Sequence, residues 1–381
     1  YNYNPPVAIS GFEFIDFSTT ATKHTRPHAC RLPDSGLVVA VSVDDSNTVT
    51  AWRQSASGLW SSATVATTSA SSGAGTPDIA ATVVATPEGR LICLYTAATS
   101  SGASSTQIKS ATSDDGGATW TVTDSDGLAS VLGKASSKYL RIRAAYLNGL
   151  VSVLLWEQDA TDTIYQYVSA DEGATLTLVE TFAVADKACP DLIAYRGALH
   201  IVTVEYDASK SNSKAVGRFR RLASAALPLS GAAVVEMMAD TTGNMEWGNY
   251  SGGMFAGAEL AIVGDDGGDL WVYAVDFHAS AKKEVFVRAS TDGGDSWQQV
   301  GTSSHHALGV TPFWSGTTTD ILRDICAIPH RGSVLLLSRS NASTATSDDS
   351  LLATRLGGWS DVGLPELAAN ARRTGAMGWD S

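Results

Sequence analysis

The segment SDDGGATW (Ser113–Trp120) carries the pattern that decides the fold, S-x-D-x-G-x-[ST]-W. A second copy, STDGGDSW, spans Ser290–Trp297, and a third, SADEGATL, spans Ser169–Leu176 and ends in Leu instead of Trp. A short polar motif that recurs along one chain indicates repeated structural units. At 381 residues the chain is also long for one ordinary hydrophobic core, which an array of small repeated units explains.

A second repeat consists of two apolar stretches joined by a turn that contains glycine, as in ATVVATPEGRLICLY around Gly89. Glycine supplies the positive φ that tight hairpin turns require. Six such turns lie roughly 50 to 70 residues apart, and each interval accommodates four short strands. The turns contain Gly36, Gly89, Gly149, Gly197, Gly267 with Gly268, and Gly332.

These two repeats predict an all-β fold, a six-bladed β-propeller of four-stranded antiparallel blades that spans residues 1–381 as a single domain. A ring of blades leaves few exposed sheet edges. The segment 7–18 is expected to complete the last blade and close the ring. The expected blades span residues 24–66, 76–126, 139–183, 187–235, 246–302 and 313–364.

Within each copy of the polar motif, which we call a box, the side chains are expected to hold a backbone turn together. The Asp accepts hydrogen bonds from turn amides, the Gly permits the tight backbone, and the Ser or Thr adds a local hydrogen bond. The Trp packs between adjacent blades. We therefore interpret the boxes as structural elements. Their expected structural residues are Ser113, Asp115, Gly117, Trp120, Asp171, Gly173, Asp292, Gly294 and Trp297.

The boxes and the stretch TRPHACRLPDSGLVVAV (Thr25–Val41) resemble the sialidase (neuraminidase) superfamily of Asp-box, or BNR-repeat, propellers. In that family an Arg-Ile-Pro segment opens the first inner strand, and here Arg26 is followed directly by Pro27, so the match is partial. The resemblance extends from about residue 24 to residue 363. It is a marker of fold more than of activity, because similar propellers serve as glycosidases, lectin-like modules, receptors and assembly proteins.

The resemblance implies a site on the face opposite the glycine turns, where inner strands begin and second strands end. A sialidase holds the substrate carboxylate with an Arg cluster, because guanidinium groups bind carboxylates through paired hydrogen bonds. A carboxyl acts as acid and then base, and a Tyr assisted by a Glu attacks the sugar. The substrate-binding candidates are Arg26, Arg143, Arg323, Asp78 and Trp247, with Arg218, Arg220 or Arg221 as a further clamp. The catalytic candidates are Asp44 or Asp45 as acid/base, Glu205 as the Tyr partner, and Tyr250 as nucleophile.

The sequence departs from the family at the nucleophile. The family places its Tyr near the last blade, whereas this chain has no Tyr after Tyr273. Tyr250 is the remaining substitute, and it belongs to an earlier blade. Structural roles compete with the functional ones: an Arg at a strand start often forms a surface salt bridge, and Asp44–Asp45 and Glu205–Asp207 also suit a turn or a solvated loop. Tyr250 and Trp247 either stack on a sugar or pack the connection between blades.

Composition argues against several classes of function. The formal net charge of −13 and the pI near 4.9 argue against nucleic acid or an anionic membrane as the main partner. No run of 18 apolar residues predicts a membrane span, and no motif predicts a metal or another cofactor. The four Cys residues either form disulfides or remain buried thiols. The start YNYNPP, without Met, leads us to expect a trimmed precursor.

Two functions remain. The first is an extracellular or particle-surface propeller that binds glycans, or that serves as a structural or adhesion subunit beside other protein subunits, without the full sialidase catalytic set. The missing terminal Tyr and the long polar loops, such as TTSASSGAG (Thr67–Gly75), favour this function. The second is an exo-acting, retaining glycoside hydrolase of sialidase type, which Arg26 and the carboxylates on the same face favour. A glycan or glycoconjugate is the expected partner in both.

Overall fold

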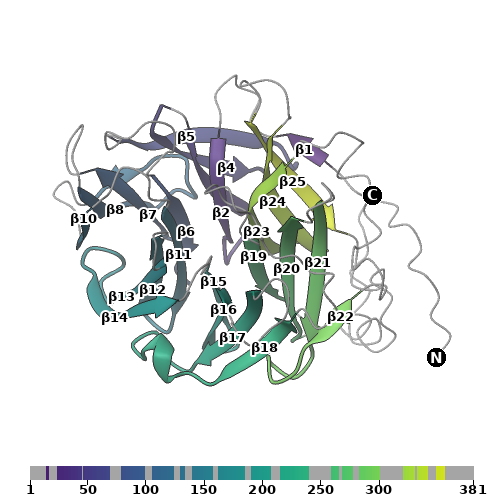
Figure 1. Cartoon of the computed structure of the whole chain (residues 1–381). Helices are drawn as coiled ribbons and strands as arrows, with labels where there is room; N and C mark the ends of the chain where they lie inside the picture. Colours follow the sequence, from purple (N-terminus) through teal and green to yellow (C-terminus); the bar gives the residue numbers. More distant parts are fainter. Residues whose placement is uncertain are drawn as a thin grey trace.

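In this computed structural model small sheets are arranged around a common centre (Figure 1). Among the described residues the strands number 25, in six antiparallel sheets, with one short 3-10 helix at Leu229–Gly231. The described residues are 14–16, 24–44, 46–68, 79–98, 105–123, 129–133, 140–157, 162–184, 190–206, 215–239, 259–265, 268–277, 283–300, 321–330, 333–341 and 349–356.

The first three sheets along the chain have β2, β6 and β11 as their innermost strands. The first sheet contains β2 (His24–Arg31), β3 (Val38–Asp44), β4 (Thr48–Gln54) and β5 (Trp60–Thr67). The second contains β6 (Ala81–Ala85), β7 (Leu91–Ala98), β8 (Ser105–Ser113), β9 (Thr121–Val122) and β10 (Ala129–Gly133). The third contains β11 (Leu140–Leu147), β12 (Leu150–Glu157), β13 (Asp162–Ser169) and β14 (Thr177–Val184).

The other three sheets have β15, β19 and β23 as their innermost strands. The fourth sheet contains β15 (Asp191–Tyr195), β16 (Ala198–Tyr206), β17 (Ala215–Leu222) and β18 (Val234–Ala239). The fifth contains β19 (Glu259–Gly264), β20 (Leu270–Phe277), β21 (Lys283–Ser290) and β22 (Gln298–Val300). The sixth contains β23 (Ile321–His330), β24 (Ser333–Asn341), β25 (Asp349–Leu356) and β1 (Phe14–Asp16).

The innermost strands form a closed ring around the central channel. β2 contacts β6, and the contacts continue through β11, β15 and β19 to β23, which in turn contacts β2. β1 pairs antiparallel with β25, with Phe14 opposite Thr354, so a strand from the N-terminal part of the chain forms the outer edge of the sixth sheet. This pairing joins the first and last described strands in one sheet.

The all-β propeller of small antiparallel sheets predicted from the sequence is confirmed. The expected number of four-stranded sheets is corrected, because the described part of the chain has five of them and not six. In the remaining sheet two short strands share the outer edge of β8: β9 pairs with Ala111 and Thr112, and β10 pairs with Ser105–Ile108. The outer position of that sheet is therefore divided between two strands.

Burial explains why the apolar runs are continuous near the middle of each sheet. Every residue of β3 and β7 is buried, whereas the outer strand β5 is mostly exposed or half-buried. Neighbouring sheets cover both faces of a middle strand, so it needs no polar face. The hairpin between β11 and β12 turns on Asn148 and Gly149, whose φ values of 51° and 84° fit a two-residue type I′ turn.

The three boxes fold in the same way. Ser113 Oγ donates to Asp115 Oδ1 at 2.8 Å and accepts from the Gly117 amide at 2.9 Å, while Asp115 Oδ1 accepts from the Thr119 amide at 2.9 Å. The hydrogen bonds from Thr119 lower the pKa of the Asp115 carboxyl. Equivalent bonds join Ser169, Asp171, Gly173 and Thr175 in the third sheet, and Ser290, Asp292, Gly294 and Ser296 in the fifth.

Each box packs against the preceding sheet. A Cβ atom on Gly173 would lie 2.9 Å from Ile92 Cγ2 of β7, and one on Gly294 would overlap the ring of Phe219 on β17. The Trp297 ring meets Phe219 edge-on, with centroids 5.2 Å apart and an angle of 61° between the rings. Glycine is therefore required in the box both for its positive φ and for the close approach of the neighbouring sheet.

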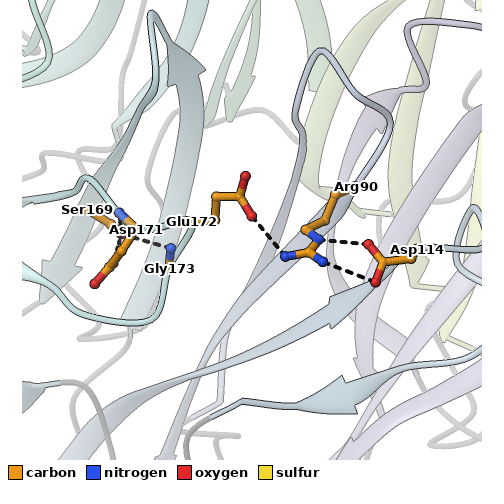
Figure 2. Close-up of polar contacts among 6 residues, drawn as sticks. All are labelled: Arg90, Asp114, Ser169, Asp171, Glu172 and Gly173. Carbon is orange, nitrogen blue, oxygen red and sulfur yellow. Dashed lines mark hydrogen bonds and ion pairs between the residues drawn. The ribbon is translucent and has the colours of Figure 1, made fainter.

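Figure 2 shows an ion-pair bridge between the boxes of the second and third sheets. Arg90, in the turn between β6 and β7, contacts Asp114 Oδ1 through Nε at 2.7 Å and Glu172 Oε2 through Nη1 at 2.9 Å. The Arg90 side chain is 42% exposed and that of Asp114 is 68% exposed. Because water screens such pairs, the bridge contributes less to stability than the packing of the box glycines.

We predict that Gly294→Ala lowers the free energy of unfolding by about 2 to 4 kcal/mol, because the added methyl group overlaps Phe219 and the φ of 100° strains any side chain. Gly58→Ala is the matched control, since Gly58 has a φ of 84° but no atom within 4 Å of its Cβ position. It should show the backbone strain alone, about 1 kcal/mol. Urea unfolding of both variants measures the difference, and equal losses would contradict interlocking at the box.

Candidate functional site

A buried ion pair lies in the central channel. Arg143 on β11 contacts Asp191 Oδ1 on β15 through Nε at 3.2 Å, and their side chains are 1% and 4% exposed. Asp191 Oδ2 accepts from the backbone amide of Ile262 on β19 at 2.9 Å. Burial raises the pKa of Asp191, while Arg143 and Arg141 act in the opposite direction. Two charged side chains thus connect the inner strands of the third, fourth and fifth sheets.

Arg141, two residues earlier on β11, extends across the channel. Its Nη2 donates to the carbonyl of Leu260 on β19 at 3.2 Å and to that of Ile325 on β23 at 3.3 Å. The Arg141 residue is 2% exposed. Because β19 and β23 belong to the fifth and sixth sheets, this one guanidinium group connects the third sheet to two sheets that are remote from it in sequence.

His28 and Thr82 extend the cluster to the first two sheets. His28 Nδ1 lies 3.0 Å from Thr82 Oγ1 and accepts from the Val83 amide at 3.3 Å. Thr82 Oγ1 itself accepts from the Ala144 amide at 3.1 Å, so its hydroxyl proton is directed to His28. Burial, followed by the charges of Arg143 and Arg141, holds the pKa of His28 well below its usual range. The imidazole is therefore neutral near pH 7, with its proton on Nε2.

We call His28, Thr82, Arg141, Arg143 and Asp191 the channel cluster. A cavity of about 250 Å³ lies on one side of it. It is lined by residues of all six inner strands, and the lining extends to Arg31, Tyr146, Tyr195 and Pro329, at or next to the last residues of their strands. Because inner strands run into the glycine turns, this cavity lies toward the turn face, the side that also carries the boxes. Of the predicted catalytic residues, Asp44 and Glu205 are described, and both are near the ends of second strands, on the opposite side, which we call the working face.

Asp44 is at the end of β3, on the working face. Its Oδ1 accepts from the backbone amides of Ser46 at 2.9 Å and Thr48 at 2.8 Å. The residue is 9% exposed. The carboxylate therefore closes the turn between β3 and β4. Asp45, the alternative acid/base candidate, lies outside the described residues.

Glu205, near the end of β16, belongs to a second buried group of charges. Its Oε1 accepts from Arg220 Nη1 and, at 2.7 Å, from Thr203 Oγ1, while its Oε2 lies 3.2 Å from Arg218 Nη1. Arg220 is also stacked over the ring of Phe182 on β14 at 5.2 Å from the centroid. The group therefore lies against the third sheet, and the 26% exposed Arg218 side chain is its solvent-facing member.

The structure describes only some of the remaining predicted site residues. Arg26 is on β2 and Arg323 on β23, near the starts of two inner strands that contact one another, but their side chains are outside the described part of the structure. Asp78, Trp247 and Tyr250 also lie outside the described residues. Arg143 is described, but its partner is Asp191 in the channel, whereas Glu205 belongs to the separate group with Arg218 and Arg220.

Sequence reasoning missed the channel cluster. Arg143 was a substrate-binding candidate, but nothing in the sequence paired it with Asp191, and His28 was not among the candidates. One feature of the sequence could have predicted the cluster: polar residues interrupt the otherwise apolar inner strands in PHAC, RIRAAY and PDLIAY. Buried polar groups require partners, so such residues are expected to find one another in the folded ring.

Three further features concern the thiols, metal ligands and membrane-spanning helices of the described residues. Cys30, Cys93 and Cys326 are free thiols, and burial raises the pKa of each, that of Cys326 to about 11. Cys189 lies outside the described residues. Within the described ranges, no group of three or more His, Cys, Asp or Glu is placed to hold a metal ion. The same part of the chain contains no helix of the length and apolarity needed to cross a membrane.

No family model matches the chain, and no curated protein matches it. Solved structures do match. Trypanosoma rangeli sialidase aligns with a TM-score of 0.56 and 12% identity over 96% of this chain and 61% of the sialidase, so the chain spans about three fifths of that protein. Penicillium chrysogenum alpha-L-arabinanase, complexed with arabinobiose, aligns with a TM-score of 0.55 and 14% identity over 94% of this chain and 99% of the arabinanase.

A Dyadobacter fermentans protein of unknown function also aligns, with a TM-score of 0.53 and 12% identity over 91% of this chain and 99% of its own length. At such identities the likeness concerns the fold alone. The chain is thus similar in fold to propellers that include a sialidase and an arabinanase.

We predict that Asp191→Asn lowers the free energy of unfolding by about 3 kcal/mol, because it leaves the buried Arg143 without its carboxylate. Asp114→Asn, which removes the exposed partner of Arg90, is the control and should cause no measurable change. Guanidinium unfolding of both variants tests this. A large loss in the control, or none in Asp191→Asn, would show that the channel pair is not a principal support of the ring.

A second prediction concerns pH. Burial lowers the pKa of His200 from 6.5 to about 4, and its Nε2 lies 3.1 Å from the Tyr195 carbonyl. Below pH 6.5 the unfolded chain takes up a proton that the folded chain does not, so stability falls as pH falls toward 4. His200→Gln keeps a donor for Tyr195 but cannot titrate. The variant should lose about 2 kcal/mol less than the wild type between pH 7 and pH 5 in urea unfolding. Parallel losses would refute the buried neutral histidine.

Proposed function

We propose that the chain is an extracellular or particle-surface, sialidase-like propeller with six blades that binds glycans and lacks the full catalytic set of a sialidase. The observation that carries the proposal is the engagement of Glu205 within the fold. Arg220, Arg218 and Thr203 all contact its carboxylate. These three contacts give the Glu205 carboxylate a structural role within the fold, as the partner of two arginines and a threonine.

The state of Asp44 supports the same proposal. Both of its described hydrogen bonds come from backbone amides of its own turn, Ser46 and Thr48. A carboxylate that accepts from the backbone amides of its own turn has the hydrogen bonding of an Asx-type turn residue. Asp44 therefore suits a turn better than an acid/base role.

Binding of a sugar is supported by the fold and by the charges of the working face. The similar structures include a sialidase and an arabinanase with arabinobiose. On the working face Arg218 is partly exposed beside Glu205, and a guanidinium group suits an acidic sugar carboxylate. In this proposal the glycan is the ligand of the working face, and neighbouring protein subunits are further partners of a structural or adhesion protein.

One observation favours the alternative, an exo-acting glycoside hydrolase of sialidase type. Arg26 and Arg323 occupy the starts of β2 and β23, two contacting inner strands, which places their backbones at the same end of the channel. Two arginines at that position would provide part of a carboxylate clamp. The experiment that follows separates the two functions.

We predict that the purified chain binds sialylated glycans on an array and does not hydrolyse a fluorogenic sialoside. Arg26→Ala should weaken the array signal at least tenfold, since hydrogen bonds from a charged donor are among the strong contacts to a carboxylate. Arg31→Ala is the matched control, because Arg31 is on the same strand but at the turn-face end. It should bind as the wild type does.

The outcomes distinguish the two functions. Sialoside turnover that Arg26→Ala abolishes would establish the hydrolase and refute the non-catalytic binder. Absence of both binding and turnover would refute both carbohydrate functions for the working face.

A further inference from the structure

The turn-face cavity is separate from the working face. The channel cluster of His28, Thr82, Arg141, Arg143 and Asp191 lies between them, and its members are 6% exposed or less. The cavity is lined by residues from all six inner strands, so its walls are held by the closed ring and not by loops. A pocket of this kind is preformed, which favours binding of a small ligand.

His28 presents an unused donor in this cavity. Its Nδ1 is occupied by Thr82 and Val83, so the proton of the neutral ring is on Nε2. Among the described residues Nε2 has no hydrogen-bond partner, although His28 is 6% exposed and lines the cavity. A ring nitrogen that lines a cavity without a protein partner is available to a ligand or water atom that accepts a hydrogen bond.

The surrounding charges favour an anion. Asp191 is the one acidic residue in the described lining, and its two oxygens already accept from Arg143 and from the Ile262 amide. Behind the lining are two guanidinium groups, Arg141 and Arg143, and Arg31 stands at the exposed end of the lining. The channel cluster therefore holds two positive charges, of Arg141 and Arg143, against the one negative charge of Asp191, and this excess lies beside the cavity.

The volume limits the size of the ligand. At about 250 Å³ the cavity is smaller than the sites of drug-sized molecules, which occupy roughly 300 to 1,000 Å³. Its lining contains the aliphatic side chains of Val83, Ala144 and Leu192 beside the polar groups, so a ligand with a short apolar part fits better than a fully polar ion.

We propose that the turn-face cavity binds a small aliphatic monocarboxylate, one oxygen of which accepts a hydrogen bond from His28 Nε2. The excess guanidinium charge behind the lining stabilises the carboxylate, and the aliphatic wall contacts the short alkyl part. This site does not rest on the function proposed for the working face, since the two lie on opposite sides of the channel cluster.

Titration calorimetry with acetate tests the proposal, with acetamide as a neutral probe of the same shape. We expect saturable acetate binding near pH 7 and at least tenfold weaker binding of acetamide, because the charge carries the preference. His28→Asn should weaken acetate binding at least tenfold. The Asn oxygen replaces Nδ1 as the acceptor for Thr82 and Val83, but the variant has no donor at the position of Nε2.

Two variants that replace an alanine by leucine test the proposal independently if His28→Asn fails to fold. Ala194→Leu places a larger side chain in the cavity lining and should abolish acetate binding. Ala63→Leu, at a similarly half-buried position on the outer strand β5, should leave it unchanged. Equal heats for acetate and acetamide, or acetate binding that survives Ala194→Leu, would overturn the proposal.

Discussion

The ion pair between Arg143 and Asp191 is the interaction on which the closed ring depends. The innermost strand of each sheet is an edge strand, so its backbone amides and carbonyls face the channel without a neighbouring strand to pair with. Asp191 accepts from the Ile262 amide, and Arg141 donates to the carbonyls of Leu260 and Ile325. The channel charges therefore satisfy edge groups that six converging strands would otherwise leave buried and unpaired.

Two kinds of contact hold the sheets together: apolar packing between neighbouring sheets and polar contacts in the channel. Between the sheets, apolar clusters and the box glycines supply close packing, as where Gly294 meets Phe219 and Gly173 meets Ile92. Such packing is strong but tolerates several related arrangements. The polar groups of the channel are compatible with fewer arrangements of the sheets. A buried guanidinium group without its acceptors lowers the stability of the fold. We infer that packing supplies most of the stability and that the channel cluster favours one closed arrangement of the ring.

Much of the fold followed from local sequence patterns, since a hairpin turn such as Asn148–Gly149 and a box such as Ser113–Trp120 are encoded by residues close in the chain. The divided outer edge of β8 did not follow, because pairing of both β9 and β10 with one strand leaves no periodic signal. The channel cluster was harder still. Arg141 and Ile325 are 184 residues apart, and their contact exists only after the ring has closed. The predicted roles of Asp44 and Glu205 came from position along a strand, which does not reveal the hydrogen-bond partners that occupy them.

The channel cluster also decides which substitutions can report on function. Arg143 was a reasonable substrate-binding candidate by its place on an inner strand, but its guanidinium group is 1% exposed and paired with Asp191. Loss of binding after its substitution would therefore be ambiguous between a missing ligand contact and a weakened ring. Arg218 keeps an exposed fraction of 26%, and Arg31 is exposed on the other side of the cluster. Substitutions at the two ends of the channel therefore separate effects on ligand binding from effects on folding better than substitutions of the buried arginines in the channel cluster.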